Sequence, residues 1–108
     1  MQDNNKAEIR KGLLIAAVLQ VIGNRQVYAG EILKALQSTL FATQEGTLYP
    51  LLGKLKREGL LLHEWVESPS GPPRKYYRLS TYGLAYCKEL LAYTKNVGNE
   101  LSKLRGAK

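Results

Sequence analysis

The pattern of apolar and polar positions predicts a series of helices interrupted by one hairpin. Residues 9–22 are apolar on almost every side, which indicates a first helix that is either central in the fold or shared with a second subunit. Gly23 and Asn24 follow it as a stop suited to a left-handed cap. A second helix is expected at residues 29–37, where the apolar residues mark one buried face.

A third helix is expected at residues 45–58, because leucines recur there at spacings of three and four and direct one face to the core. Pro50 must lie near the start of this helix, since farther in it would remove a backbone hydrogen bond. The opposite face must then point outward, and it carries Thr47, Tyr49, Pro50, Gly53, Lys54 and Arg57. Such a face suits insertion into a DNA groove, although an ordinary solvated face would have similar residues.

A β-hairpin is predicted at residues 60–80, where the apolar period changes from 3.6 toward 2. Tyr77 and Leu79 would form the inward face of its returning strand, and Trp65 is expected to pack over the hairpin and the edge of the first helix. The segment SPSGPP, residues 68–73, is expected to be a projecting loop, because prolines and glycine interrupt a ladder. Arg74 and Lys75 would lie at the base of that loop.

A long C-terminal helix is expected at residues 81–104, with Ser80 as its N-cap. Its apolar face is too broad for the core of one small domain to cover, which favours pairing with the first helix of a second subunit. An autonomous coiled coil is disfavoured because Gly98 and Asn99 interrupt the repeat. The residues assigned to the dimer interface, or to an effector site within it, are Leu13, Ala17, Tyr86, Leu90, Tyr93 and Val97.

These elements predict a mainly α fold with a small β-hairpin wing, of the α+β class. We expect a winged helix-turn-helix domain at residues 1–80, followed by a C-terminal dimerisation helix at residues 81–108. A length of 108 residues suffices for one domain but not for a second folded module.

The charge distribution favours an anionic partner. The chain has 16 Lys and Arg against 9 Asp and Glu, a formal net charge of +7. Residues 46–57 and 68–78 contain cations and no acid, and these are the two places where a winged helix would meet phosphate.

The residues that could carry chemistry are few. His63 lacks Cys or acidic partners at metal spacing, so we expect a structural or surface role for it. The single cysteine, Cys87, lies in an apolar helix and is expected to be a core residue. Paired carboxylates, a glycine-rich phosphate loop and a catalytic triad are not found in the sequence. We therefore expect no enzyme activity, no metal and no cofactor.

The sequence also predicts a soluble, cytoplasmic protein. A lone cysteine fits a reducing compartment. The first residues hold no signal-peptide core, and the apolar run at residues 12–22 is shorter than the roughly 20 residues of a membrane span. We expect no association with a membrane.

Two sequence elements, GTLYP at residues 46–50 and RKYYRL at residues 74–79, are specific when they occur together at this separation. With Trp65, Glu67 and Gly83 around them, they closely resemble the PadR family of bacterial transcriptional regulators, over about residues 9–95. The resemblance implies that the GTLYP helix is the recognition helix, that the hairpin is the wing, and that the C-terminal helix pairs with a second subunit. It also implies repression of transcription, which in many members is relieved by a small molecule such as a phenolic acid or a cationic drug.

The chain departs from the family at the start of the second helix. The family often has aromatic, Gly, aromatic, Glu there, whereas this chain has Tyr28, Ala29, Gly30 and Glu31. Tyr28 and Glu31 carry over, but the second aromatic does not. We therefore still expect an intact helix-turn-helix, without the packing or contact that the second aromatic would make.

We therefore expect a homodimeric regulator, most simply a repressor, that binds double-stranded DNA at an inverted-repeat operator. In the major groove, Thr47, Tyr49 and Pro50 would approach bases, and Lys54 and Arg57 would reach base edges or phosphates. Arg74 and Lys75 would contact the backbone or the minor groove, and Tyr28 completes the predicted DNA-binding set.

The sequence leaves two alternatives open. A winged-helix module could bind an acidic protein partner through the same surfaces without binding DNA. Separately, the aromatic residues Tyr86 and Tyr93 suit a flat aromatic or cationic effector, but they equally suit dimer packing.

Overall fold

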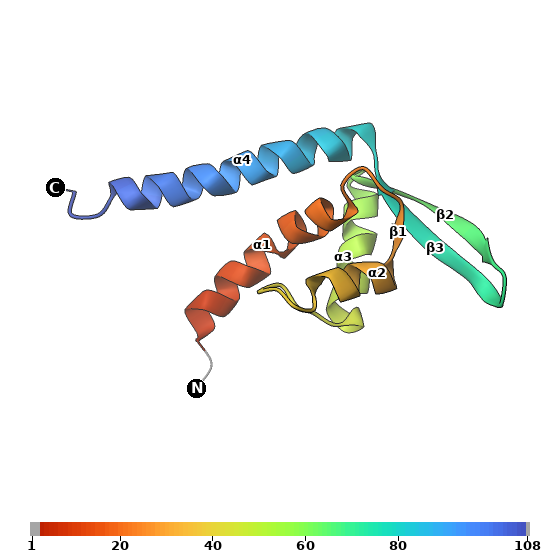
Figure 1. The fold of residues 1–108 in the computed structure, drawn as a ribbon. Coiled ribbons are helices and arrows are strands. Elements are labelled where there is room, and N and C mark those ends of the chain that lie inside the picture. The colour runs from red at the N-terminus through yellow and green to blue at the C-terminus, as the bar shows by residue number, and fades with distance from the viewer. Residues whose placement is uncertain (1–2, 108) are drawn as a thin grey trace.

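The structure, a computed structural model, describes residues 3–107 and has four helices and a three-stranded antiparallel sheet (Figure 1). The described residues confirm the expected fold class, mainly α with a small β wing. Residues 1, 2 and 108, which belong to the expected domains 1–80 and 81–108, lie outside the described residues. The order of elements is α1 (Asn4–Ile22), β1 (Val27–Tyr28), α2 (Ala29–Leu36), α3 (Glu45–Arg57), β2 (Leu61–Ser68), β3 (Gly71–Leu79) and α4 (Thr81–Lys103).

A single apolar core holds α1, α2 and α3 against the root of the hairpin. The helices contribute their leucine and isoleucine stripes, and β3 contributes its inward face, as the sequence pattern predicts. Because one face of α3 is held in this core, the opposite face is left to solvent. The buried residues are Leu14, Val18, Leu19, Ile22, Val27, Ala29, Ile32, Leu36, Leu48, Leu52, Leu55, Leu60, Leu61, Tyr77, Leu79 and Cys87.

The helix boundaries differ from the expected ones mainly at α1. This helix begins at Asn4 rather than near Ile9, because the side chain of Asp3 caps it by accepting a hydrogen bond from the Lys6 backbone N–H at 3.1 Å. The added first turn is polar and mostly exposed, so it has no apolar periodicity that would reveal it. At the other end, Gly23 ends α1 with a φ of 55° and donates its N–H to the Leu19 carbonyl.

Pro50 lies in the second turn of α3, which begins at Glu45 as expected. Proline has no N–H, so the carbonyl of Gly46, four residues earlier, lacks its usual partner in the helix. Both residues are exposed, which allows water to satisfy that carbonyl at small cost. The helix then ends at Arg57, followed by Gly59 with a φ of 80°.

The prediction of a projecting loop at residues 68–73 is wrong, because Ser68 belongs to β2 and residues 71–73 belong to β3. Ser68 pairs with Gly71, so the turn consists of Pro69 and Ser70 only. A register irregularity between Val66 and Ser68 places an extra residue on β3 beside the prolines. Prolines are tolerated here because β1 stops at Tyr28, which leaves this end of β3 as an edge strand whose outer side needs no N–H donors.

The strand β1 is the element that the sequence pattern missed. The sheet order is β1-β3-β2, and β1 pairs Val27 with Tyr77 and Tyr28 with Tyr76. Two residues are too few to show an alternating pattern. Their pairing places the start of α2 beside the wing.

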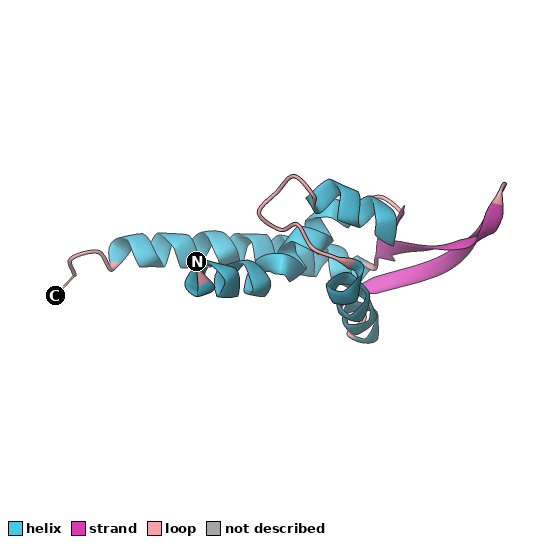
Figure 2. Ribbon diagram, turned by 90° about the horizontal axis from the view of Figure 1, so that it is seen from below, coloured by secondary structure: helices cyan, strands magenta, loops and turns pink. Residues whose placement is uncertain are grey.

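The last helix, α4, projects well beyond the rest of the molecule (Figures 1 and 2). Ser80 caps it as expected, by accepting a hydrogen bond from the Gly83 N–H at 2.9 Å. Its first half packs near α1, and its second half carries exposed apolar side chains, including Leu101, which is 64% exposed. Within residues 3–107, no helix is long and apolar enough to cross a membrane.

Candidate nucleic-acid interface

The outward face of α3 is exposed except at Gly53, which is half-buried. Thr47, Tyr49 and Pro50 are exposed in its first half, and Lys54 and Arg57 follow in its second half. The ion pairs within residues 3–107 are Lys6 with Asp3 and Lys103 with Glu100, and both lie on other helices. The two cations of this face are therefore available to an outside anion.

The wing holds its two cations against aromatic rings. Arg74 and Lys75 are consecutive in β3 and leave it on opposite faces. The guanidinium carbon of Arg74 lies 4.5 Å from the centre of the Tyr28 ring. The Lys75 Nζ lies 5.8 Å from the Trp65 ring centre and 5.6 Å from that of Tyr77, so both cations have cation–π partners.

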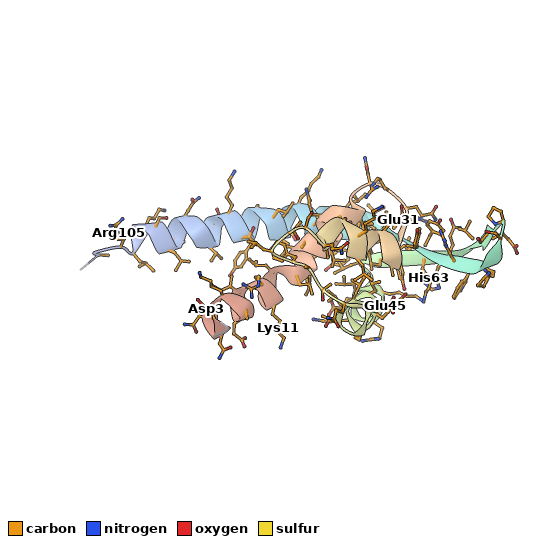
Figure 3. All side chains as sticks on the ribbon, turned by 60° about the horizontal axis from the view of Figure 1, so that its bottom comes forward. Asp3, Lys11, Glu31, Glu45, His63 and Arg105 are labelled. Carbon is orange, nitrogen blue, oxygen red and sulfur yellow. The ribbon has the colours of Figure 1, made fainter. Side chains whose placement is uncertain are left out.

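Tyr28 connects the wing to the start of α2. Its ring meets that of Tyr76 edge-on, with ring centres 5.5 Å apart and an interplanar angle of 75°. Its backbone N–H donates to the Glu31 carboxylate at 3.1 Å, which caps the first turn of α2 (Glu31 is labelled in Figure 3). Tyr28 is thereby held at both its backbone and its ring.

A hollow of about 280 Å³ lies where α2, α3 and the wing meet. It brings together four of the predicted DNA-binding residues: Tyr28, Tyr49, Arg74 and Lys75. The other four, Thr47, Pro50, Lys54 and Arg57, lie along α3 outside it, and Thr47 lines a separate hollow beside Arg10 and Lys11 of α1. We call the hollow of about 280 Å³ between α2, α3 and the wing the wing hollow. Its lining residues are Tyr28, Ala29, Gly30, Tyr49, Trp65, Arg74, Lys75 and Tyr77.

Trp65 and Gly30 belong to this site, and the sequence did not assign them to it. Trp65 is 64% exposed on the wing, so the expectation that it packs over the edge of the first helix is wrong. It pairs with Lys75 across β2 and β3. The missing information was the position of the turn and of the bulge. A regular ladder from the turn at Pro69 and Ser70 would place Trp65 opposite Arg74, and the extra residue on β3 moves its partner to Lys75.

His63 lies near the start of β2 and contacts Lys56, which is close to the end of α3 (His63 is labelled in Figure 3). The Lys56 Nζ lies 3.5 Å from its Nε2, while its Nδ1 is buried without a partner within the described residues. Burial, and then the charges of Lys56 and Lys75, lower the pKa of His63 below its ordinary value of 6.5. The ring is therefore neutral near pH 7, with Nε2 accepting from Lys56.

Tyr77 of β3 is close enough to Tyr49 of α3 for the two phenols to affect each other's ionisation. Burial, and then the neighbouring phenol of Tyr49, raise the pKa of Tyr77 above its ordinary value of 10.0. Tyr77 thus stays an uncharged phenol at neutral pH. The wing hollow consequently carries the positive charges of Arg74 and Lys75 with no carboxylate among its lining residues.

The residues assigned to a dimer or effector site lie in two separate places. Leu13 and Ala17 line a hollow of about 230 Å³ between α1 and α4. Tyr86, Leu90 and Tyr93 line an open one of about 560 Å³ on α4 alone, while Val97 lines neither and is 41% exposed.

Cys87 faces α1, on the buried side of α4. Its Sγ lies 3.7 Å from the Gln20 Oε1. Burial raises the pKa of the thiol above its ordinary value, which suits the expected core role and makes the thiolate scarce at neutral pH.

Comparison with known proteins identifies relatives of the whole fold. A family described as the transcriptional regulator PadR-like family matches residues 18–89. A PadR-like transcription factor from Bacteroides fragilis is 40% identical, and the similarity covers 94% of this chain and 99% of that one, with a TM-score of 0.79. A PadR family transcriptional regulator from Eggerthella lenta is 32% identical, covering 94% and 89% of the two chains, with a TM-score of 0.84. An uncharacterised protein from Lysinibacillus sphaericus is 28% identical over 89 residues, covering 80% of this chain and 82% of its own.

Proposed function

The chain belongs to the PadR-like family of transcriptional regulators, and from this membership we propose that it is a homodimeric repressor that binds an inverted repeat in double-stranded DNA. The observation that carries this proposal is the wing hollow, which joins Tyr49 of α3 to Arg74 and Lys75 of the wing in one surface. The cations on both sides of this junction form no ion pair within residues 3–107. A helix and a wing with free cations match the chemistry of a DNA groove flanked by phosphates.

The roles of the residues follow from where they lie. Thr47, Tyr49 and Pro50 occupy the exposed first half of α3 and are assigned to bases in the major groove. Lys54 and Arg57, farther along the same face, are assigned to base edges or phosphates. Arg74, Lys75 and Tyr28 are assigned to the backbone at the adjacent minor groove.

The dimer is supported by α4. The second half of this helix exposes a row of large apolar side chains, which a soluble protein rarely leaves uncovered. Pairing with α1 of a second subunit would cover this row and place two recognition helices around a two-fold axis. The row consists of Tyr93, Val97 and Leu101 of α4, continued by Leu104, the C-cap of the helix.

An effector, if one releases the protein from DNA, is assigned to the open hollow on α4. Tyr86 and Tyr93 would stack against a flat aromatic or cationic compound there. In the dimer the same hollow would face the partner, so binding at this place would alter the spacing of the two recognition helices. The compound should weaken operator binding by the wild-type protein. It should cause no further change in operator binding by a Tyr93→Ala variant, and this pair of results would support the assignment.

Selection of bound sequences from random double-stranded DNA tests the proposal directly. The expected result is an inverted repeat with half-site centres about 34 Å apart, roughly one helical turn. Enrichment of a single asymmetric half-site would contradict the dimer. No enrichment at micromolar protein would contradict DNA binding.

Repression needs its own test. In a purified transcription reaction, the protein should lower transcript from a promoter that overlaps the selected repeat. The same promoter with one half-site scrambled should be insensitive at that protein concentration. An increase in transcript from the intact promoter would show activation instead.

A further inference from the structure

Gly30, in the first turn of α2, leaves room for the ring of Tyr28. A Cβ at residue 30 would lie 2.8 Å from Cε2 and 3.3 Å from Cδ2 of that ring, closer than carbon atoms pack. Glycine is a poor helix residue, so helix stability does not explain its presence here. It allows the Tyr28 ring to lie across the start of α2.

The Tyr28 ring in turn supports Arg74. The guanidinium carbon lies 4.5 Å from the ring centre, and Tyr76 meets the same ring edge-on at 5.5 Å. A guanidinium that lies against a ring keeps its N–H groups directed outward in its own plane, where they are free to donate. Arg74 is thus held without an acidic partner, and its side chain loses less freedom when it meets an anion.

The second cation reaches the wing hollow from the other face of β3. Lys75 lies between Trp65 and Tyr77, within 5.8 Å of both ring centres. The hollow therefore has two positive charges and aromatic walls, and none of its lining residues is acidic. These features suit a small singly charged oxyanion with several acceptor oxygens, joined to a moderately apolar group.

We propose that the wing hollow receives one backbone phosphodiester of each DNA half-site, and that Gly30 acts as a positioning residue for it through Tyr28 and Arg74. The inference rests on the proposed function and deepens it. If α3 lies in the major groove and the wing reaches the adjacent minor groove, the strand between these grooves must pass between α3 and the wing. The wing hollow is the place where those two elements meet.

Replacing single phosphates of the selected operator by uncharged methylphosphonates tests the site. For the wild-type protein, one position in each half-site should weaken binding about tenfold, because a charge-assisted contact is lost. With Arg74→Ala, the same replacement should have little further effect. Equal sensitivity of both proteins at every position would overturn the phosphate assignment.

The role of Gly30 is tested by a double-mutant cycle. Gly30→Ala should weaken operator binding about fivefold to tenfold, through displacement of the Tyr28 ring, and should add nothing in an Arg74→Ala or a Tyr28→Ala background. Gly12→Ala is the matched control, since Gly12 is also helical and a Cβ there has no neighbour within 4 Å. Thermal unfolding checks that all variants fold.

The outcomes separate this inference from the proposed function. If Gly30→Ala binds like the wild type, or if its effect adds fully to that of Arg74→Ala, the positioning role is wrong while DNA binding stands. If the wild-type protein selects no DNA at all, both proposals fall. A loss of binding by Gly12→Ala equal to that by Gly30→Ala would also contradict a role specific to Gly30.

Discussion

Gly83 of α4 lies directly against the backbone of Leu60. A Cβ at residue 83 would collide with the Leu60 carbonyl oxygen and would lie 3.0 Å from its carbonyl carbon. The same carbonyl accepts the Ser80 N–H at 3.0 Å, and the Ser80 Oγ donates to the neighbouring Gly59 carbonyl at 2.6 Å. The first turn of α4 is therefore docked on the junction between α3 and β2 by backbone contact.

Replacing Gly83 by Ala should destabilise the protein by about 2 kcal/mol, because the backbone of Leu60 cannot move aside as a flexible side chain would. The measurement is the free energy of unfolding in denaturant. Gly98→Ala is the control in the same helix, since a Cβ there has no neighbour within 4 Å. It should raise stability by up to about 1 kcal/mol through helix propensity. A similar stabilisation by both changes would contradict the tight docking.

Lys75 and Tyr49 should differ in how they affect DNA binding. Lys75→Ala should weaken binding to all sequences and reduce the slope of log affinity against log salt by about one unit, because one phosphate contact is lost. Tyr49→Ala should instead change which sequences are preferred in selection, since Tyr49 is assigned to bases. Lys88→Ala, an exposed change on α4, serves as the control. An unchanged salt slope for Lys75→Ala would mean that the wing assignment is wrong.

Leu101→Glu should convert the protein to a monomer at micromolar concentration. Leu101 is 64% exposed in one protomer, so the change costs little there, but it would place a charge inside the proposed dimer interface. The molar mass of each variant in solution is measured by light scattering. Leu101→Glu should have the mass of a monomer, and the control Lys88→Glu should keep the mass of a dimer. If the wild-type protein is itself a monomer, the proposed dimer is wrong, and with it the expectation of an inverted-repeat operator.

His63 should make the protein less stable in mild acid. Its pKa is lowered in the fold, so the unfolded chain binds the proton more readily than the folded protein does. The stabilisation is therefore fully present above about pH 6.5, the ordinary value, and is lost as the pH falls toward the lowered pKa. The midpoint of thermal unfolding should drop between pH 7.5 and 5.5, and His63→Gln should flatten that drop. An equally steep drop in the variant would assign it to other groups.

Much of the fold could be predicted because its signals are local. The spacing of Leu48, Leu52 and Leu55 orients α3 whatever surrounds it, since residues three and four apart share one face of a helix. Ser80 and Gly59 likewise mark their helix ends through bonds and dihedral angles of neighbouring residues. Tyr49, Arg74 and Lys75 were assigned to the candidate site from such local placement.

Other features depended on segments distant in the chain. The prolines near the wing tip are compatible with a strand only because β1 ends at Tyr28 and leaves the edge of β3 free, and no pattern within residues 68–73 reveals that edge. The start of α1 depended on one capping bond from Asp3 rather than on apolar periodicity. Trp65 was misplaced because its surroundings depend on the register of β2 against β3.

The sequence by itself determined the four helices and the hairpin, the outward face of α3 and the positive charge of α3 and the wing, because periodicity and composition act over a few neighbouring residues. Only the tertiary structure decided how these residues meet. It brings Gly30, Tyr28 and Arg74 into one stack, although they lie in three different elements. Such a stack depends on β1 pairing beside β3, a contact between segments almost fifty residues apart that no local pattern specifies.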